Sequence, residues 1–217
     1  MQPLWFGGKM KYTHILWDFN GTSLDDVNTC IKTVNSLLSE RGYKTIDSVE
    51  EYHSVFGFPV TEYYKKLGFD FEKESYDVIA KQWVSLYLEN VKEASIFEDV
   101  REKAEHFKNL GLYQVIISAT EIDMLKKQLA DLDLINCFDD VWGMDNIRAE
   151  SKVRMAERWR EKNPNAVALM IGDTLHDAEV AKTIGADCIL VARGHQSYEA
   201  LSSFGCPVVN SLSEIIL

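Results

Sequence analysis

Two apolar segments of the chain end at aspartates that could act together. Residues 13–17 favour a β-strand and lead to Asp18, and residues 166–171 lead to Asp173 in a similar way. Buried strands of an α/β protein present such residues at the carboxyl edge of a parallel sheet, where ligands bind. Because like charges repel, two carboxylates that meet at this edge indicate a bound cation or a shared reaction.

Three more polar residues occupy comparable positions. Ser118 follows the apolar segment 112–117, Lys152 lies near the start of a predicted helix, and Asp177 follows Asp173 by four residues. Each is a weak signal alone, because serines at strand ends and lysines on helices are common. Their order along the chain is more informative than any one of them.

That order resembles a known family. Asp18-Phe19-Asn20-Gly21-Thr22 and the segment 172–177 (Gly-Asp-Thr-Leu-His-Asp) are similar to the first and last signatures of the haloacid dehalogenase superfamily. Most members are Mg²⁺-dependent phosphatases. The resemblance covers residues 12–217 and is greatest to the branch of phosphoglycolate phosphatase and β-phosphoglucomutase. It implies a hydrolase that acts on a small phosphorylated metabolite.

The resemblance also implies a role for each catalytic residue. Asp18 would attack phosphorus to give an aspartyl-phosphate. Ser118 and the backbone N–H of Ala119 would hold a phosphoryl oxygen, and Lys152 would neutralise charge on the nucleophile and the phosphoryl group. The predicted substrate-binding residues are Gly21, Thr22, Ser118, Ala119 and Lys152.

The same resemblance implies a Mg²⁺ site. Its ligands would be Asp18, the backbone carbonyl of Asn20, Asp173 and Asp177, of which Asp177 either binds Mg²⁺ through water or fixes the loop. Oxygen ligands without cysteine or histidine suit Mg²⁺ better than zinc.

Asn20 departs from the family pattern, which has a second aspartate there. That aspartate protonates the leaving oxygen and later activates the hydrolytic water, whereas an amide cannot shuttle protons near neutral pH. We therefore expect the metal site to be kept and the acid–base step to be weakened. His176 and His195 are candidate substitutes.

Asn20 also leaves other functions open. Haloacid dehalogenases and phosphonoacetaldehyde hydrolases lack the second aspartate too. Dehalogenation needs no metal, so Asp173 and Asp177 count against it; a phosphonatase would need a cap lysine, for which Lys65 and Lys66 are candidates by position. A regulatory protein that binds phosphate with little turnover is a further alternative.

The elements that must position these residues alternate after residue 95. Helices are predicted near 98–110, 121–131, 151–162 and 175–184, and strands at 112–117, 140–142, 166–171, 187–191 and 207–209. This alternation predicts an α/β fold with a doubly wound parallel sheet.

A helical block precedes this alternation. Its predicted helices lie at 24–41, 59–67 and 71–90, and it resembles the α-helical cap that one branch of the superfamily inserts after the first strand. We expect a core domain of residues 1–23 and 96–217 and a cap of residues 24–95, whose loop at 56–59 could face the site.

The composition of the chain limits which partners it can bind and in which cell compartment we expect it. A net charge of −11 argues against nucleic-acid and anionic-membrane binding. The four cysteines are scattered and form no C-x-x-C pair, so we expect free thiols in a reducing cytoplasm. No apolar segment is long enough to span a membrane. We expect a cytoplasmic monomer or small homo-oligomer, and we assign no function to residues 1–9.

Overall fold

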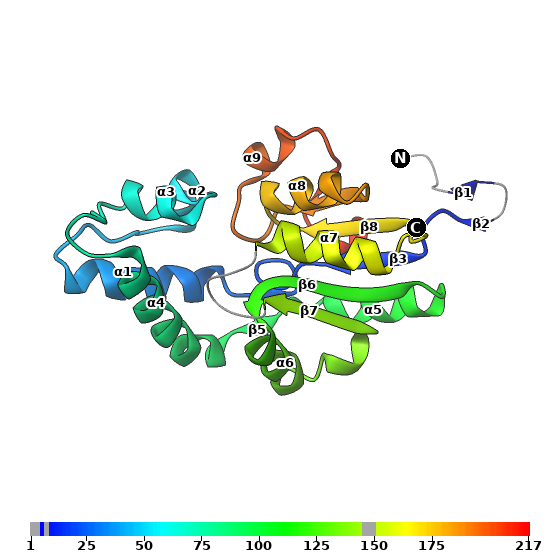
Figure 1. Cartoon of the computed structure of the whole chain (residues 1–217), viewed down its shortest axis with the longest axis horizontal. Coiled ribbons are helices and arrows are strands. Elements are labelled where there is room, and N and C mark those ends of the chain that lie inside the picture. The colour runs from blue at the N-terminus through cyan, green and yellow to red at the C-terminus, as the bar shows by residue number, and fades with distance from the viewer. Residues whose placement is uncertain (1–4, 7–8, 145–150) are drawn as a thin grey trace.

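A six-stranded parallel sheet forms the centre of the larger part of the molecule (Figure 1). The computed structural model describes residues 5–6, 9–144 and 151–217. The strand order is β10-β9-β8-β3-β6-β7, and every neighbouring pair is parallel. The strands are β3 (His14–Trp17), β6 (Tyr113–Glu121), β7 (Asp140–Met144), β8 (Ala168–Gly172), β9 (Asp187–Val191) and β10 (Val208–Val209). The predicted α/β class is confirmed.

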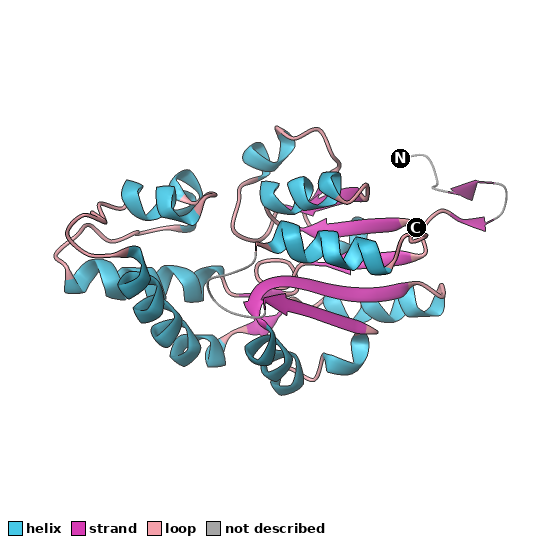
Figure 2. Cartoon of the chain, in the orientation of Figure 1, coloured by secondary structure: helices cyan, strands magenta, loops and turns pink. Residues whose placement is uncertain are grey.

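Helices cover both faces of this sheet. α5 (Val100–Asn109) and α6 (Ile122–Asp131) contribute to the core on one face, whereas α7 (Lys152–Lys162) and α8 (Leu175–Thr183) contribute to the core on the other. A short helix, α9 (Tyr198–Ser202), follows β9 and was not expected from the sequence. Figure 2 shows these helices on either side of the strands.

The two cores explain why the buried middle of each central strand has apolar residues at consecutive positions. In β3, Ile15 and Trp17 belong to the core beneath α5 and α6, and Leu16 belongs to the core beneath α7 and α8. Side chains of a strand alternate between faces, so a strand covered on both sides must be apolar throughout. Burial on both sides fixes β3 and therefore the position of the residue that follows it, Asp18.

Four helices form the inserted block at the left of Figure 1. They are α1 (Val27–Glu40), α2 (Val49–Val55), α3 (Val60–Lys66) and α4 (Tyr76–Asn90). The block has its own apolar core, in which Val34 and Leu37 of α1 are fully buried together with Ile79 of α4. The expected helical insertion is therefore present.

The first helix of the block begins later than predicted. Leu24–Asp25 forms a short strand, β4, that pairs antiparallel with β5 (Ser95–Ile96). The turn after β3 explains the difference: the backbone N–H of Leu24 donates to the Phe19 carbonyl and that of Gly21 donates to the Leu24 carbonyl, so Leu24 is already engaged before the helix starts. The chain enters and leaves the block side by side, and the domain boundaries at 24 and 95 stay a prediction.

Other differences are smaller. β6 extends to Glu121, so Ser118 lies within a strand instead of at its end, and α4 begins at Tyr76 instead of residue 71. Near the N-terminus, Trp5–Phe6 pairs with Lys9–Met10; the rest of residues 1–9 lies outside the described ranges, as does Arg148, a neighbour of Lys152 in sequence. None of the helices over the described ranges combines the length and apolar composition that a membrane span requires.

The block's own core predicts a sharp contrast between two neighbouring residues of α4. Ile79 is fully buried, whereas Val78 is 53% exposed. We expect Ile79→Ala to lower the free energy of unfolding by about 2–5 kcal/mol, because it leaves a cavity. Val78→Ala on the same helix should change it by less than about 0.5 kcal/mol. Equal losses in urea denaturation followed by tryptophan fluorescence would contradict this core.

Candidate active site

The two aspartates predicted to meet directly follow the neighbouring strands β3 and β8. β3 pairs with β8 so that Trp17 is opposite Ile171, and the backbone N–H of Asp18 donates to the Ile171 carbonyl at 2.8 Å. Asp18 is 8% exposed and Asp173 is fully buried. The register of one pair of strands thus places both carboxylates at the carboxyl edge of the sheet.

Lys152 joins this pair from the first turn of α7. Its ammonium group forms ion pairs with the carboxylates of Asp18 and Asp177, and the residue is only 5% exposed. The N-cap of the helix, Ser151, accepts a hydrogen bond from the N–H of Arg154 and so fixes where the helix starts. Burial opposes the charged lysine, but the two carboxylates outweigh it and raise the pKa of Lys152.

Asp177 is held by the start of α8. The N-cap residue Thr174 donates its backbone N–H at 3.0 Å and its hydroxyl at 2.7 Å to Asp177 Oδ2, while Asp177 Oδ1 faces Lys152. Gly172 leaves room for this carboxylate, since a Cβ there would lie 2.4 Å from the Asp177 side chain. A capping box therefore presents a third carboxylate beside those of Asp18 and Asp173.

Asp18, Asp173 and Asp177 together could hold a metal ion. One carboxylate oxygen from each lies within 4.8 Å of the other two. Lys152 is the one cation paired with this triad among the described residues, which leaves two negative charges unbalanced in a buried site. Burial raises the pKa of Asp18 and its acidic neighbours raise it further, and the opposing charge of Lys152 does not offset them. A divalent cation would remove that imbalance.

Most of the other predicted residues lie around the same centre. Thr22 donates its hydroxyl to Asp173 Oδ1 at 2.9 Å, and a Cβ on Gly21 would lie 2.3 Å from Asp173 Oδ2. Ser118 and Ala119 line the cavity above Asp18. Ser118 Oγ accepts from the N–H of Thr120 at 3.1 Å.

The side chain of Asn20 forms hydrogen bonds at both ends of its amide. Its Oδ1 accepts from the Thr120 hydroxyl at 3.0 Å. Its Nδ2 donates to Asp26 Oδ2 at 2.8 Å and to the Tyr87 hydroxyl at 2.7 Å. The Tyr87 hydroxyl also donates to Asp26 Oδ2, at 2.6 Å, so that a residue of α4 reaches the edge of the sheet.

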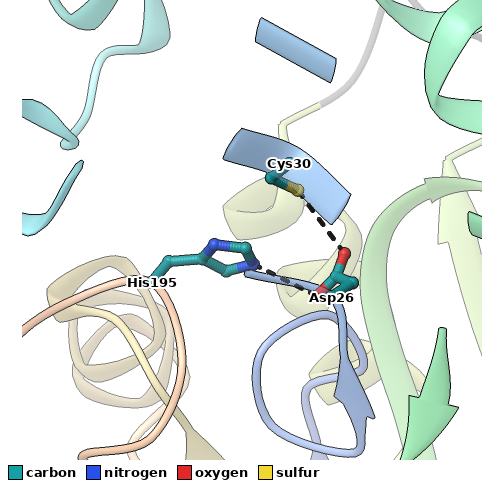
Figure 3. Close-up of side chains that lie close together, drawn as sticks. All are labelled: Asp26, Cys30 and His195. Atoms are coloured by element: carbon teal, nitrogen blue, oxygen red, sulfur yellow. Dashed lines mark hydrogen bonds and ion pairs between the residues drawn. The ribbon is translucent and has the colours of Figure 1, made fainter. Parts of the chain in front are cut away.

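Asp26 is the residue that sequence reasoning missed. It precedes α1, is fully buried, and lies next to Cys30 and His195 (Figure 3). Cys30 Sγ is 3.6 Å from Asp26 Oδ2, and His195 Nε2 is 3.4 Å from Asp26 Oδ1. Burial opposes its ionisation, but these and other donors lower the pKa of Asp26. In sequence it resembles an ordinary helix cap beside Asp25, which explains the omission.

The two candidate histidines differ in their surroundings. His195 lies in the site: its backbone N–H donates to Asp173 Oδ2 at 2.6 Å, and its Nδ1 lies 2.9 Å from the Tyr52 hydroxyl of α2. Burial opposes its charged form, but the Asp26 carboxylate raises the pKa of His195 to about 9. His176 instead stacks on Phe58 with ring centroids 4.8 Å apart.

A cavity of about 360 Å³ extends from the triad to the helical block. Phe56 and Phe58 line it, as expected for the loop at 56–59. Lys65 and Lys66 do not line it, and they contact Glu62 and the Val55 carbonyl instead. The structure therefore offers neither candidate lysine to a phosphonatase reaction.

Comparison with known proteins agrees with this geometry. The family model of haloacid dehalogenase-like hydrolases matches residues 15–191. The protein named "Putative pyrophosphatase PpaX" of Caldanaerobacter subterraneus is 26% identical over 198 residues, which cover 88% of this chain and 87% of that protein. A phosphoglycolate phosphatase of Colwellia psychrerythraea is 23% identical, with 88% and 89% covered.

The fold is also shared with solved structures whose sequences are less similar to this chain than those of these relatives. The structure of protein tyrosine kinase A of Mycobacterium tuberculosis superposes with a TM-score of 0.78 at 16% identity, covering 94% of this chain and 95% of that one. At such low sequence identity, a shared fold is no evidence of a shared activity. The family match spans most of the chain and includes Asp18, Lys152 and Asp173, and so this protein belongs to the haloacid dehalogenase-like hydrolases.

Proposed function

We propose that the protein is a Mg²⁺-dependent phosphatase that hydrolyses small phosphorylated metabolites through an aspartyl-phosphate on Asp18. One observation carries the proposal: the Asp18 carboxylate lines a cavity, forms an ion pair with Lys152, and shares its edge of the sheet with Asp173 and Asp177. Two of its relatives, one named a putative pyrophosphatase and one a phosphoglycolate phosphatase, support phosphate chemistry.

Mg²⁺ suits the residues present. Asp18, Asp173 and Asp177 offer only carboxylate oxygens, and their unbalanced charge matches a divalent ion. When bound, the ion would supply positive charge that offsets repulsion between the phosphate and the acids. The Asn20 backbone carbonyl stays a proposed ligand.

The residues of the chain suit the first chemical step. An Asp18 carboxylate oxygen forms a bond to phosphorus while the bond from phosphorus to the leaving oxygen breaks. The Lys152 ammonium group, already paired with Asp18 Oδ1, would stabilise negative charge that spreads over the phosphoryl oxygens. Ser118 and the Ala119 N–H would hold one of these oxygens.

Proton transfer is the step that this site supports least. Water must then attack phosphorus and lose a proton while the bond to Asp18 breaks. Asn20 cannot take that proton, and its amide is occupied by Thr120, Tyr87 and Asp26. Asp26, the carboxylate bonded to that amide, has a lowered pKa, so it is a weak base and carries no proton to donate near neutral pH. We therefore propose that activated phosphates, whose leaving oxygens need no proton, react fastest.

The nucleophile can be tested with a variant of the same shape. Asp18→Asn removes the charge that attacks phosphorus, so turnover of p-nitrophenyl phosphate should fall by at least about 10³-fold. Asp131→Asn, on the exposed end of α6, is the matched control and should retain wild-type rates. Retention of most activity in Asp18→Asn would refute the assignment.

Removal of Mg²⁺ tests the metal. Excess chelator should abolish turnover, because the phosphate would then face three carboxylates and one lysine. Adding Mg²⁺ back should restore the rate, and the midpoint of the restoration gives the apparent affinity. Full turnover in chelator would instead favour the metal-independent chemistry of dehalogenases.

The role of Asn20 requires a pair of substitutions. Asn20→Asp alone would place a carboxylate 2.8 Å from that of Asp26, so the two would repel and the gain should be small. Asn20→Asp combined with Asp26→Asn exchanges the two side chains and keeps the hydrogen bond. We expect this double variant to raise kcat/KM for alkyl phosphates by about 10²-fold, the low end of general acid–base effects. No gain in either variant would show that another group carries the proton.

A further inference from the structure

The cavity changes character with distance from the triad. Its floor carries the acids and Lys152, whereas its walls in α2, α3 and α4 are almost entirely aromatic or aliphatic. Burial raises the pKa of Tyr63 and of Tyr64, so both phenols stay neutral. These walls include Phe56, Tyr63, Tyr64, Tyr76, Trp83 and Val84.

Over the residues that the structure describes, the walls also offer no free positive charge. Among the described residues that line the cavity, Lys152 is the one lysine or arginine, and it is already bound by Asp18 and Asp177. Each of the two lining histidines contacts a carboxylate: His195 contacts Asp26, and His176 contacts Glu179.

A further carboxylate lies toward the block. Glu121 lines the cavity, and its oxygens accept hydrogen bonds from the backbone N–H groups of Asp123 and Met124. These donors keep the Glu121 side chain at the start of α6 and offer no positive side chain to a ligand. Among the described lining residues of the walls, a second anionic group on a substrate would thus meet neutral rings and a carboxylate.

From these walls we infer that the substrate is a phosphomonoester with an uncharged, apolar and preferably aromatic organic group. The inference rests on the proposed phosphatase function and names its substrate class. A carboxylate or second phosphate, as in phosphoglycolate or pyrophosphate, would lose its water without gaining a partner. An aromatic group would instead pack against Trp83 and the tyrosines.

Asn20 supports the same class by an independent route. Aryl oxygens leave with little need of a proton, and Asn20 cannot supply one. Asn20 at the floor of the cavity thus favours an aryl leaving group, and the aromatic walls would also accommodate an aryl group best.

The test must separate the walls from the leaving group. 4-Propylphenyl phosphate and 3-(4-phosphonooxyphenyl)propanoate release phenols of nearly equal acidity and differ in charge at the far end. We expect kcat/KM with Mg²⁺ to be at least about 100-fold higher for the neutral ester, because a buried polar group without a partner is strongly discriminated against. Equal values would overturn the inference.

A substitution in the wall should move this preference. Val84→Arg adds a cation to the cavity side of α4, and we expect kcat/KM for the carboxylate ester to rise at least about 10-fold relative to that for the neutral ester. Val78→Arg adds the same charge to the exposed side of that helix and should leave the ratio unchanged. An unchanged ratio in a folded Val84→Arg protein would count against the inference.

Binding distinguishes this inference from the phosphatase proposal. The dissociation constants of the two matching arylphosphonates, which cannot be hydrolysed, can be measured by calorimetry with Mg²⁺. Tighter binding of the neutral phosphonate by at least about 10-fold supports the inference even if no ester is turned over, in which case the phosphatase proposal alone fails. Equal affinities together with ready hydrolysis of both esters would refute the inference and leave the phosphatase proposal standing.

Discussion

The buried ion pairs of Lys152 with Asp18 and Asp177 are the constraint on which the site depends. Charges removed from water are costly unless each has a partner, and one lysine cannot neutralise three neighbouring carboxylates. The strands β3 and β8 and the starts of α7 and α8 must therefore hold like charges together. A rigid sheet covered on both faces can do so, because its register leaves the acids no room to separate.

Much of this centre could be predicted because it depends on local sequence and on strand order. Apolar segments that end in Asp18 and Asp173 identify buried strands, and parallel strands end at one edge. The position of Lys152 could be predicted because its helix is recognisable from the sequence and begins directly after the N-cap residue Ser151. The matching family model covers this same part of the chain. Each of these features is set by a few consecutive residues.

The contacts that were missed depend on packing between distant segments. Nothing in the sequence indicates that Tyr87 of α4 reaches Asp26, or that Asp26 takes the amide of Asn20. Periodicity identifies aromatic residues on a helix, but it does not distinguish the ring that fills a core from the ring that lines a cavity. Tyr52 does both: it is buried in the core of the block and contacts His195. Such roles follow only from how the block sits on the sheet.

The paired strands β4 and β5 have an evolutionary consequence. Because the chain departs from the sheet and returns to it through adjacent strands, the four helices between them can change length or composition without shifting the register of β3 against β6. Most of the apolar recognition surface is thus encoded apart from Asp18, Lys152 and Asp173, although Asp26 and Tyr87, which hold the Asn20 side chain, belong to the intervening stretch. Exchange of the intervening stretch between homologues that both carry Asp26 and Tyr87 would keep the acids and the lysine of the site and change the substrates that the cavity accepts.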